Sequence, residues 1–422
     1  MRRGRMIREI ISTYFQNPNL HEDFHAICDT GGRFAGSKSE EDARFYLSNR
    51  LKKITGIYPV HQNIKYLGWS RVDASLVQLN GIQRSFPCVP LVRSPSTASD
   101  GLVAELINLG RGSEQDFHEN ASKIQGSVVL VQHEYVFATE TIHRRRKYQW
   151  AMDHGAVGFL IACNLPQIGP VTGSSGATPE RGIPAAGVSF ETAQALIQAE
   201  TTHVRLYIKT NEKPCETANL LVDLPGQEDE WVVLSAHIDG HHLAESAMDN
   251  ATGLAAVCAI AEAMAPYMTH CKRGLRIALF NTEEWALAGS AFFLEELAPI
   301  EREAIKLNIN LDTIAGSSHI TALTSEFQKL EDWLLSTARS HGNEISAHSP
   351  LMANSDHFNF ARHGIPAVRL VTGFNQPNSA IKFLLTPRDT REHVAHEDLE
   401  NATALAMALV AEACSTEKMD LR

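Results

Sequence analysis

The sequence predicts an α/β protein whose main domain has a mixed, mainly parallel sheet between two layers of helices. From about residue 214 onward, short apolar runs alternate with amphipathic stretches of helical length. Between about residues 100 and 210, short strand-like runs are instead separated by loops rich in glycine, proline and serine. Strands that alternate with helices favour a parallel sheet covered on both faces, and the second pattern indicates a separate, small β-rich module.

These two patterns divide the 422 residues into two expected domains. The first is discontinuous and comprises residues 1–66 and 214–422, and the second comprises residues 67–213. The length allows two or three domains, and a hydrophobic content of 44% is enough for at least one large core.

The elements of the first domain can be assigned in chain order. A helix is expected over 37–56, because this stretch starts with serine, has acids in its first turn and basic residues in its last, and ends in glycine. The later strands are NLLVDLPG, WVVLSAH, RIALF, INLD and AVRL. The helices that alternate with them are ATGLAAVCAIAEAMA, WALAGSAFFLEEL, FQKLEDWLLSTARS and a final stretch from about 397 to 414.

Composition disfavours several classes of function. The formal net charge is −11, and the basic residues are scattered apart from HRRRK at 143–147, so nucleic-acid binding is not expected. The amino-terminal stretch lacks the apolar core of a secretory signal, and no run of about 20 apolar residues predicts a membrane span. Seven widely spaced cysteines, mostly in apolar surroundings, indicate reduced thiols in a cytoplasmic protein.

Ligand-type side chains follow the ends of several predicted strands. They are His237 and Asp239 after WVVLSA, Asp249 before the next helix, Glu283 and Glu284 after RIALFN, and Asp312 after INL. In a parallel sheet these positions share one edge. Each acid taken alone is explained by a helix cap, a first helical turn or a loop turn. Together they would repel one another unless a cation neutralised them.

One histidine with several carboxylates suits zinc, and less selectively manganese or cobalt. We expect the Asp239 carboxylate to accept the second imidazole N–H of His237 and so fix its orientation. Glu283 and Glu284 are adjacent and point in different directions, so one can bind metal while the other acts as a base. A metal lowers the pKa of its bound water toward about 7, and a free carboxylate can then take the proton.

The motifs AHID, MDNATG, TEEWALAGS, NLD and SDHFNFARHGIPAV resemble those of the co-catalytic di-zinc aminopeptidases of clan MH, relatives of glutamate carboxypeptidase and glutaminyl cyclase. Their order and spacing match over roughly residues 216 to 372. The resemblance implies a three-layer α/β/α zinc-exopeptidase domain. It also implies that His237, Asp249 and Asp312 bind a first metal, that Asp249 bridges to a second metal bound by Glu284, that Glu283 is the general base, and that Asp239 supports His237.

The second domain resembles a protease-associated (PA) domain through GSVVLV, the helix ending DHGAVGFLI, and GIPAAGVSF. The stretch GGRFAGSKSEEDARFYLSNRLKKITG resembles the opening of the zinc-exopeptidase family. A PA domain inserted in such a catalytic domain implies a role in substrate access or interaction and contributes no catalytic group.

One position departs from the family pattern. The remaining metal ligand of the family is a histidine in a motif resembling YHTPxDT, and the corresponding stretch here is FLLTPRDT, with Leu385 at the histidine position. Leucine cannot coordinate a cation. The first interpretation is that another histidine replaces it, with His241 or His357 favoured over the other nearby histidines, which are His242, His393 and His396.

Two further interpretations stay open. The enzyme can use a single metal held by His237, Asp249 and Asp312, since three protein ligands and an open water position are sufficient for catalytic zinc. Alternatively, activity is lost and the chain is a PA-domain protein that binds a partner. Arg369 and Arg388 are candidates for recognising a substrate carboxylate, and each is equally consistent with a structural ion pair.

The expected function is therefore that of a zinc-dependent hydrolase of peptide or peptide-like amide bonds, foremost an aminopeptidase, with one or two zinc ions per chain and Glu283 as general base. The alternatives are a hydrolase of a small non-peptide amide with one metal or an altered second metal site, and a catalytically impaired binding protein. The expected partners are a peptide or small amide substrate, with neither nucleic acid nor membrane, and a homo-oligomer is possible.

Overall fold

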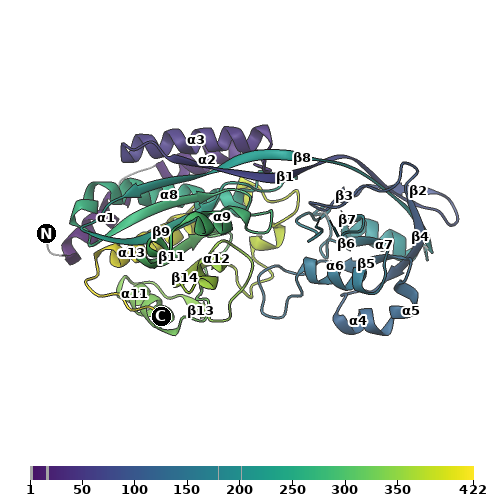
Figure 1. Ribbon diagram of the computed structural model, residues 1–422. Coiled ribbons are helices and arrows are strands. Elements are labelled where there is room, and N and C mark those ends of the chain that lie inside the picture. The colour runs from purple at the N-terminus through teal and green to yellow at the C-terminus, as the bar shows by residue number, and fades with distance from the viewer. Residues whose placement is uncertain (1–2, 16–18, 179, 201) are drawn as a thin grey trace. The chain divides into compact units, whose positions relative to one another are not determined.

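The computed structural model describes residues 3–15, 19–178, 180–200 and 202–422, and these divide into two compact units (Figure 1). The first unit comprises residues 1–65, 216–381 and 389–422, and the second comprises 66–215 and 382–388. The short segment 382–388, which the sequence analysis assigned to the first domain, thus groups with the second unit. Two long strands, β1 (Val60–Gln78) and β8 (His203–Leu224), contain the points at which the chain passes between the units.

The first unit is built on a mixed, mainly parallel sheet, as expected. Its strand order is β13-β12-β14-β11-β9-β10-β8, with β9 near the centre. Four neighbouring pairs are parallel, and the pairs β8–β10 and β12–β14 are antiparallel. The strands are β9 (Glu228–His237), β10 (Arg273–Phe280), β11 (Ile305–Leu311), β12 (Ile320–Leu323), β13 (Ser346–His348) and β14 (Ala367–Thr372).

Helices cover both faces of this sheet because alternate strand residues point to opposite sides. On one side, Val233 and Phe280 pack against Phe293 of α9 and Phe360 of α12. On the other side, α8 and α13 pack against each other and against β9, β10 and β11, and α1, α2 and α3 lie outside them (Figure 1). The helices are α1 (Arg3–Phe15), α2 (Asn19–Asp29), α3 (Lys38–Thr55), α8 (Thr252–Met264), α9 (Ala288–Glu296), α10 (Pro299–Ala304), α11 (Gln328–Ser340), α12 (His357–Arg362) and α13 (His396–Ser415).

The helix expected over 37–56 is confirmed as α3, and its ends carry the predicted signals. The Ser37 hydroxyl accepts a hydrogen bond from the backbone N–H of Glu40 at 3.2 Å. Gly56 ends the helix in the left-handed conformation, with φ of 76°, and its N–H bonds to the Lys52 carbonyl. Both caps satisfy backbone groups that a helix end leaves without a partner.

One helical run is long and apolar enough, by length and composition, to cross a membrane, which corrects the expectation that no segment approaches that length. It spans Ala247–His270, from the irregular turn before α8 to the 3₁₀ turn after it. Of the 18 residues in its most apolar stretch, 78% are buried within the protein. This burial is typical of a core helix, since α8 packs between the sheet and α2 and α3.

The second unit is rich in strands, as expected, and also contains the short helices α4 to α7. Its central sheet has the order β4-β5-β6-β7-β3, and β4 to β7 are parallel neighbours. One apolar cluster includes Val128, Leu130 and Leu160, and a second includes Val129 and Phe159, so alternate residues of the same strands supply two cores. Its remaining strands are β2 (Arg84–Phe86), β3 (Val89–Pro90), β4 (Leu102–Asn108), β5 (Val128–Gln132), β6 (Gly158–Ala162) and β7 (Ala185–Val188), and its helices are α4 (Glu114–Glu119), α5 (Ala121–Ile124), α6 (Arg144–Asp153) and α7 (Phe190–Gln198).

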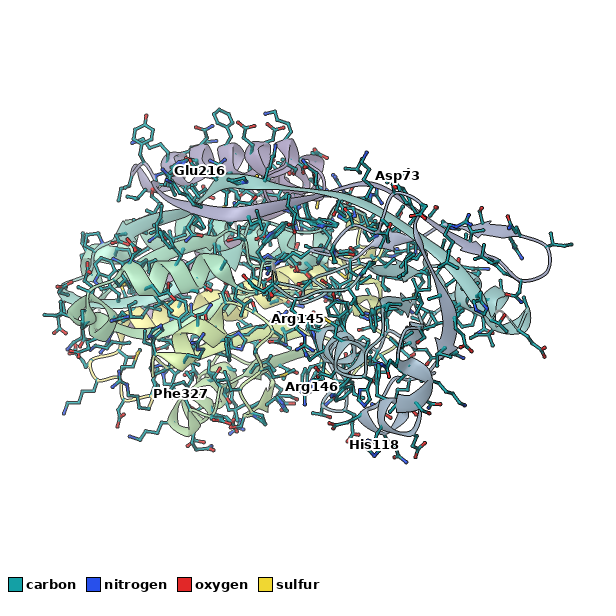
Figure 2. The ribbon with its side chains drawn as sticks, turned by 45° about the vertical axis from the view of Figure 1, so that its right-hand side comes forward. Asp73, His118, Arg145, Arg146, Glu216 and Phe327 are labelled. Atoms are coloured by element: carbon teal, nitrogen blue, oxygen red, sulfur yellow. The ribbon has the colours of Figure 1, made fainter. Side chains whose placement is uncertain are left out.

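The basic run 143–147 lies at the start of α6 and is divided between surface and interior. Arg145 is half-buried and Arg146 is exposed (both are labelled in Figure 2). Arg144 is buried and donates to the carbonyl of Ser174 at 2.7 Å. Lys147 is completely buried, and its Nζ lies 2.6 Å from Glu134 Oε1. Two of its four Lys and Arg side chains therefore serve the internal structure of the second unit.

Candidate metal centre

The carboxyl ends of β9, β10 and β11 bring the predicted ligand residues to one edge of the sheet. His237 is the last residue of β9 and pairs in register with Phe280, the last residue of β10. Glu283 follows β10 after a two-residue step, and Asp312 follows β11 directly. Because the three strands are parallel neighbours, these side chains leave the sheet side by side.

Two groups of potential ligands result. In each, the candidate ligand atoms all lie within 4.8 Å of one another. The first group is His237, Glu283 and Asp312, all of them buried. His237 Nε2 is 3.6 Å from Asp312 Oδ1 and 3.0 Å from Asp249 Oδ1. Asp249 itself belongs to the second group, so its carboxylate lies between the two.

The second group is His241, Asp249 and Glu284. His241 Nε2 lies 2.6 Å from Glu284 Oε1, and the histidine is 3% exposed. The structure therefore places one histidine in each group and the neighbouring glutamates Glu283 and Glu284 in different groups. This arrangement is what two adjacent cation positions would need.

The conventional explanations of the acids do not hold in the structure. Glu283 and Glu284 lie in a turn, and α9 begins only at Ala288, so they are not first-turn acids of a helix. Asp249 lies in an irregular turn with φ of −115° and ψ of 85°, three residues before α8 begins at Thr252, and is not its cap. These acids therefore neither cap a helix nor interact with the dipole of its first turn.

Asp239 supports the centre in a different way from that expected. The Nδ1 atom of His237 contacts the backbone oxygen of Asp239 at 2.9 Å, whereas the nearer carboxylate oxygen is 3.9 Å away. The Asp239 carboxylate instead accepts the backbone N–H groups of Glu283 at 3.0 Å and Glu284 at 3.1 Å. Asp239 thus orients His237 with its main chain and the glutamate turn with its side chain.

Asp312 forms an ion pair with a buried arginine side chain. Arg369 Nη2 lies 3.1 Å from Asp312 Oδ2, and the Ser355 hydroxyl donates to the same oxygen at 2.6 Å. Burial opposes ionisation of Asp312, but Arg369 and His237 lower its pKa. Arg369 is only 2% exposed and also donates to the Asn354 carbonyl. Of the two roles considered for Arg369, the structure shows the structural ion pair.

Asp389 is a supporting residue that the sequence reasoning did not assign. Its carboxylate accepts the backbone N–H of Met248 at 2.8 Å and that of Asp249 at 3.4 Å. These bonds fix the turn that carries Asp249. The signal was present in the sequence, because Asp389 is the aspartate of TPRDT, the motif that otherwise keeps its register around Leu385.

The electrostatics of the centre are those of crowded, buried acids. Burial raises the pKa of Asp239 and Asp389 to about 7 each and that of Asp356 to about 6, with neighbouring carboxylates adding to the effect. Burial and the nearby Glu284 also raise the pKa of Glu283 well above its usual range. A divalent cation would favour the ionised forms. The donor set, imidazole nitrogen with carboxylate oxygens, fits zinc.

The other histidines considered as replacements for the missing ligand belong to neither group. His357 starts α12, is fully buried and belongs to neither group, and burial lowers its pKa to about 3. The ring of His242 contacts Phe34 edge-on, at 5.4 Å between centroids. His396 stacks on His21 at 4.2 Å, and His393 Nε2 lies 3.4 Å from Glu392.

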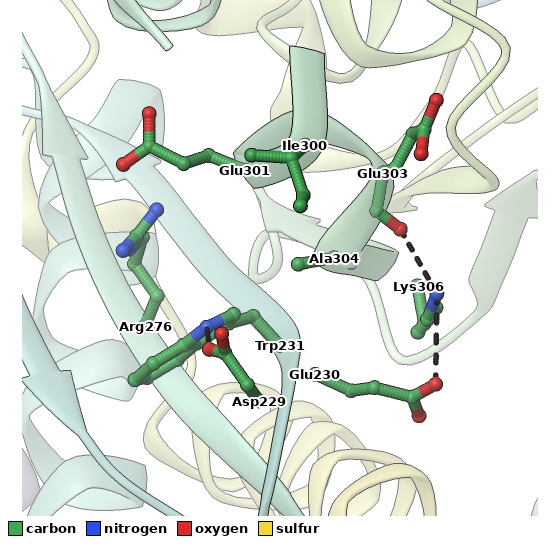
Figure 3. Close-up of a pocket in the computed structure, with 9 residues that line it drawn as sticks. All are labelled: Asp229, Glu230, Trp231, Arg276, Ile300, Glu301, Glu303, Ala304 and Lys306. Carbon is green, nitrogen blue, oxygen red and sulfur yellow. Dashed lines mark hydrogen bonds and ion pairs between the residues drawn. The ribbon is translucent and has the colours of Figure 1, made fainter. Parts of the chain in front are cut away.

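An open groove of about 510 Å³ lies in the first unit, away from these groups (Figure 3). It lies at the amino ends of β9 and β11, where Trp231 and Lys306 lie, whereas His237 and Asp312 follow the carboxyl ends. The six residue-to-residue steps from Trp231 to His237 span about 20 Å of strand. The Arg276 guanidinium lies 5.1 Å from the centre of the Trp231 ring, and Lys306 contacts Glu230. The groove is therefore not part of the candidate centre.

The fold and the site define a metal-dependent hydrolase of the α/β type with an inserted module. Residues 219–410 match peptidase family M28, and residues 89–196 match the PA domain. The chain thus contains a domain that matches peptidase family M28, with the candidate metal ligands inside it, and a second domain that matches the PA domain. It is accordingly a metallopeptidase.

Related proteins and structures cover most of the chain. It is 24% identical to Aminopeptidase YwaD of Bacillus subtilis over 395 residues, which are 92% of this chain and 82% of the relative. It is 27% identical to the probable leucine aminopeptidase 2 of Aspergillus fumigatus over 376 residues, 83% of this chain and 70% of the relative.

Solved structures share the fold. The crystal structure of a peptidase M28 precursor from Shewanella amazonensis superposes with a TM-score of 0.81 and 19% identity, covering 100% of this chain and 98% of that one. The structure of BSAP, a zinc aminopeptidase from Bacillus subtilis, gives a TM-score of 0.75 and 22% identity, covering 95% and 96% of the two chains.

Proposed function

We propose that this protein is a zinc-dependent aminopeptidase. The observation that carries the proposal is the convergence of two histidines and four acids, in two groups that share the region around Asp249, beyond the carboxyl ends of parallel strands. The relatives that span most of the chain are named aminopeptidases, and one similar structure is that of a zinc aminopeptidase. A peptide with a free amino terminus is the substrate class we infer.

The positions of these residues support the following roles. His237, Asp249 and Asp312 are suited to hold one zinc ion, and Asp249 and Glu284 face a second position. Asp239 and Asp389 orient the turns that carry these ligands through backbone hydrogen bonds. Such supporting contacts fix ligand geometry and are important for metal affinity.

Zinc held there supplies Lewis-acid activation of water and polarisation of the scissile carbonyl. Glu283 is placed beside His237 and Asp312 and is adjacent in sequence to Glu284. Its carboxylate takes a proton from the water as the water oxygen adds to the carbonyl carbon. It then returns that proton to the amine nitrogen as the carbon–nitrogen bond breaks. The buried position of Glu283 keeps bulk water from competing for that proton.

Replacement of Glu283 by glutamine tests this assignment. The amide has nearly the same shape but cannot accept the proton, so we expect kcat to fall by about 10²–10⁴-fold. Zinc content, measured by plasma emission, should stay at the wild-type level. Activity close to that of the wild type in Glu283→Gln would refute the role of Glu283 as general base.

The substrate class is tested separately. Aminoacyl-nitroanilides should be cleaved, and the same compounds with an acetylated amino group should not, because an aminopeptidase requires the free amine. Cleavage of small acylated amines in preference to aminoacyl compounds would indicate an amidase instead. We also propose a cytoplasmic location, which is supported by seven cysteines that are all free and, with one exception, buried.

A further inference from the structure

We propose that His241 supplies the nitrogen ligand of the second metal position, in place of the histidine that Leu385 replaces. The inference rests on the proposed metal centre and adds to it the identity of one ligand. Its basis is the group formed by His241, Asp249 and Glu284, in which His241 Nε2 approaches Glu284 Oε1 to 2.6 Å. The resulting donor set of one imidazole and two carboxylates matches that of the first group.

His241 lies close in sequence to His237, the histidine of the first group. It lies four residues after His237, in the loop that follows β9, so the same short segment supplies one imidazole to each group. Asp249, whose Oδ1 is 3.0 Å from His237 Nε2, belongs to the group of His241. A carboxylate in that place can be shared by two cations. Each cation position then has one histidine and one acid that it does not share, Asp312 in the first group and Glu284 in the second.

The loop that carries His241 is held rigidly by the amino-terminal part of the first unit. Arg33 is completely buried, and its guanidinium donates to the carbonyls of Ile238, Glu245 and Ser246 at 2.9, 2.7 and 2.7 Å. These carbonyls flank His241 on both sides. Charge-assisted hydrogen bonds from one guanidinium to three carbonyls restrict the backbone of this loop.

Two further contacts place the backbone of His241 itself. The Ser246 hydroxyl accepts its N–H at 2.9 Å. Gly32 packs so tightly that a Cβ atom there would lie 1.9 Å from the His241 carbonyl oxygen. The side chain is therefore presented to Glu284 from a fixed backbone. A ligand that is already in place gives up little conformational freedom when it binds a metal.

Leu385 is held by a different set of contacts, within the second unit. Its carbonyl accepts the backbone N–H of Thr172 at 2.8 Å, and its φ is 63°. Pro387 packs against Gly169, where a Cβ would lie 3.1 Å from the proline ring. The backbone of this segment thus has defined contacts, although the residue at the expected histidine position is leucine. The replacement nitrogen has to come from another part of the chain.

Metal counting on the 422-residue chain tests the inference. Metal-free protein is titrated with zinc, with plasma emission for stoichiometry and calorimetry for affinity, and cobalt absorption spectra give a second readout that needs no turnover. We expect two metals in the wild type and one in His241→Ala and His241→Gln, with the second site weakened by at least about 100-fold. Circular dichroism checks the fold of each variant, and glutamine keeps most of the volume if alanine disturbs it.

His242→Gln and His357→Gln are the matched controls, and both should keep two metals. Two metals of unchanged affinity in a folded His241 variant would overturn the inference and leave the proposed function intact. A single metal in the wild type would overturn it in favour of a one-metal enzyme. No metal in the wild type would instead remove the proposed function on which the inference rests.

Discussion

Arg369 and Asp312 form a buried ion pair next to the candidate metal centre, with 3.1 Å between Nη2 and Oδ2 and both side chains 3% exposed. Removal of one partner of such a pair leaves the other charge uncompensated, which costs about 3–5 kcal/mol. We therefore expect Arg369→Met to lower the free energy of unfolding of the metal-free protein by about that amount. Urea unfolding in the presence of a chelator measures it.

The double variant Arg369→Met/Asp312→Asn is the control for this prediction. It removes both charges, so we expect it to recover most of the lost stability, although it would also remove a proposed zinc ligand. A single variant that costs less than about 1 kcal/mol would show that Asp312 is neutralised in another way.

Asp239→Asn tests the support of the glutamate turn. The carboxylate accepts one backbone N–H with each oxygen, from Glu283 and from Glu284. Asparagine keeps one acceptor oxygen and places an amide donor against the other N–H, so the turn must shift. We expect kcat to fall by about 10–100-fold, the usual effect of losing a supporting contact at a metal site.

The metal content distinguishes this effect from a loss of the first ligand. The Asp239 backbone oxygen that contacts His237 remains in the variant, so the metal that His237 binds should stay. If Asp239→Asn removes all metal, the carboxylate acts on His237 rather than on the turn. Normal kcat would show that the turn is held without it.

The sequence was sufficient to predict which residues meet at the edge of the sheet, for a simple physical reason. Parallel strands end on the same side, so His237, Glu283 and Asp312 can be brought together from strand assignments alone. The contacts that orient them depend on turn geometry. Thr282 has a φ of 56°, which turns the N–H groups of the two glutamates toward Asp239 and could not be read from the residue types.

The choice between His241 and His357 also lay beyond the sequence. Both histidines stand close to acidic residues in the chain, but His357, the first residue of α12, is buried and belongs to neither group, whereas His241 in the loop after β9 approaches Glu284. The same limit explains why the grouping of 382–388 with the second unit could not be predicted. Its place depends on packing between distant segments, such as Phe383 against the core of the second unit.

His357 predicts a specific pH dependence of stability. Burial lowers its pKa to about 3 in the folded protein, against an ordinary value of 6.5. At pH values between these two, the unfolded state binds the proton and the folded state does not. The contribution of His357 to the free energy of unfolding is therefore fully present above about pH 6.5 and is lost as the pH falls. This one group should cost about 2 kcal/mol between pH 7 and pH 5.

Replacement of His357 by glutamine should make that acid loss smaller by the same amount, measured by urea unfolding of metal-free protein at the two pH values. His118 lies on the surface of the second unit, so His118→Gln is a matched control and should follow the wild type (Figure 2). Equal pH slopes for His357→Gln and the wild type would contradict the prediction.

Gly32→Ala tests the link between the amino-terminal segment and the second metal position. A Cβ atom at residue 32 would lie 1.9 Å from the carbonyl oxygen of His241 and 2.6 Å from that of Ala244, so the loop must move. His237 is the end of β9 and is anchored in the sheet, so the first position should be spared. We expect one zinc to bind with wild-type affinity and the other to bind more weakly.

The cost in stability should be about 1–3 kcal/mol, the usual penalty for forcing extra atoms into a packed site. Gly4→Ala is the control, because a Cβ there meets nothing within 4 Å, and it should change neither zinc affinity nor stability by a comparable amount. Two weakened zinc sites in Gly32→Ala would mean that the loop after β9 moves together with the end of the strand. Two unchanged sites would mean that the backbone of His241 adapts, and that Arg33 alone is enough to hold the ligand in place.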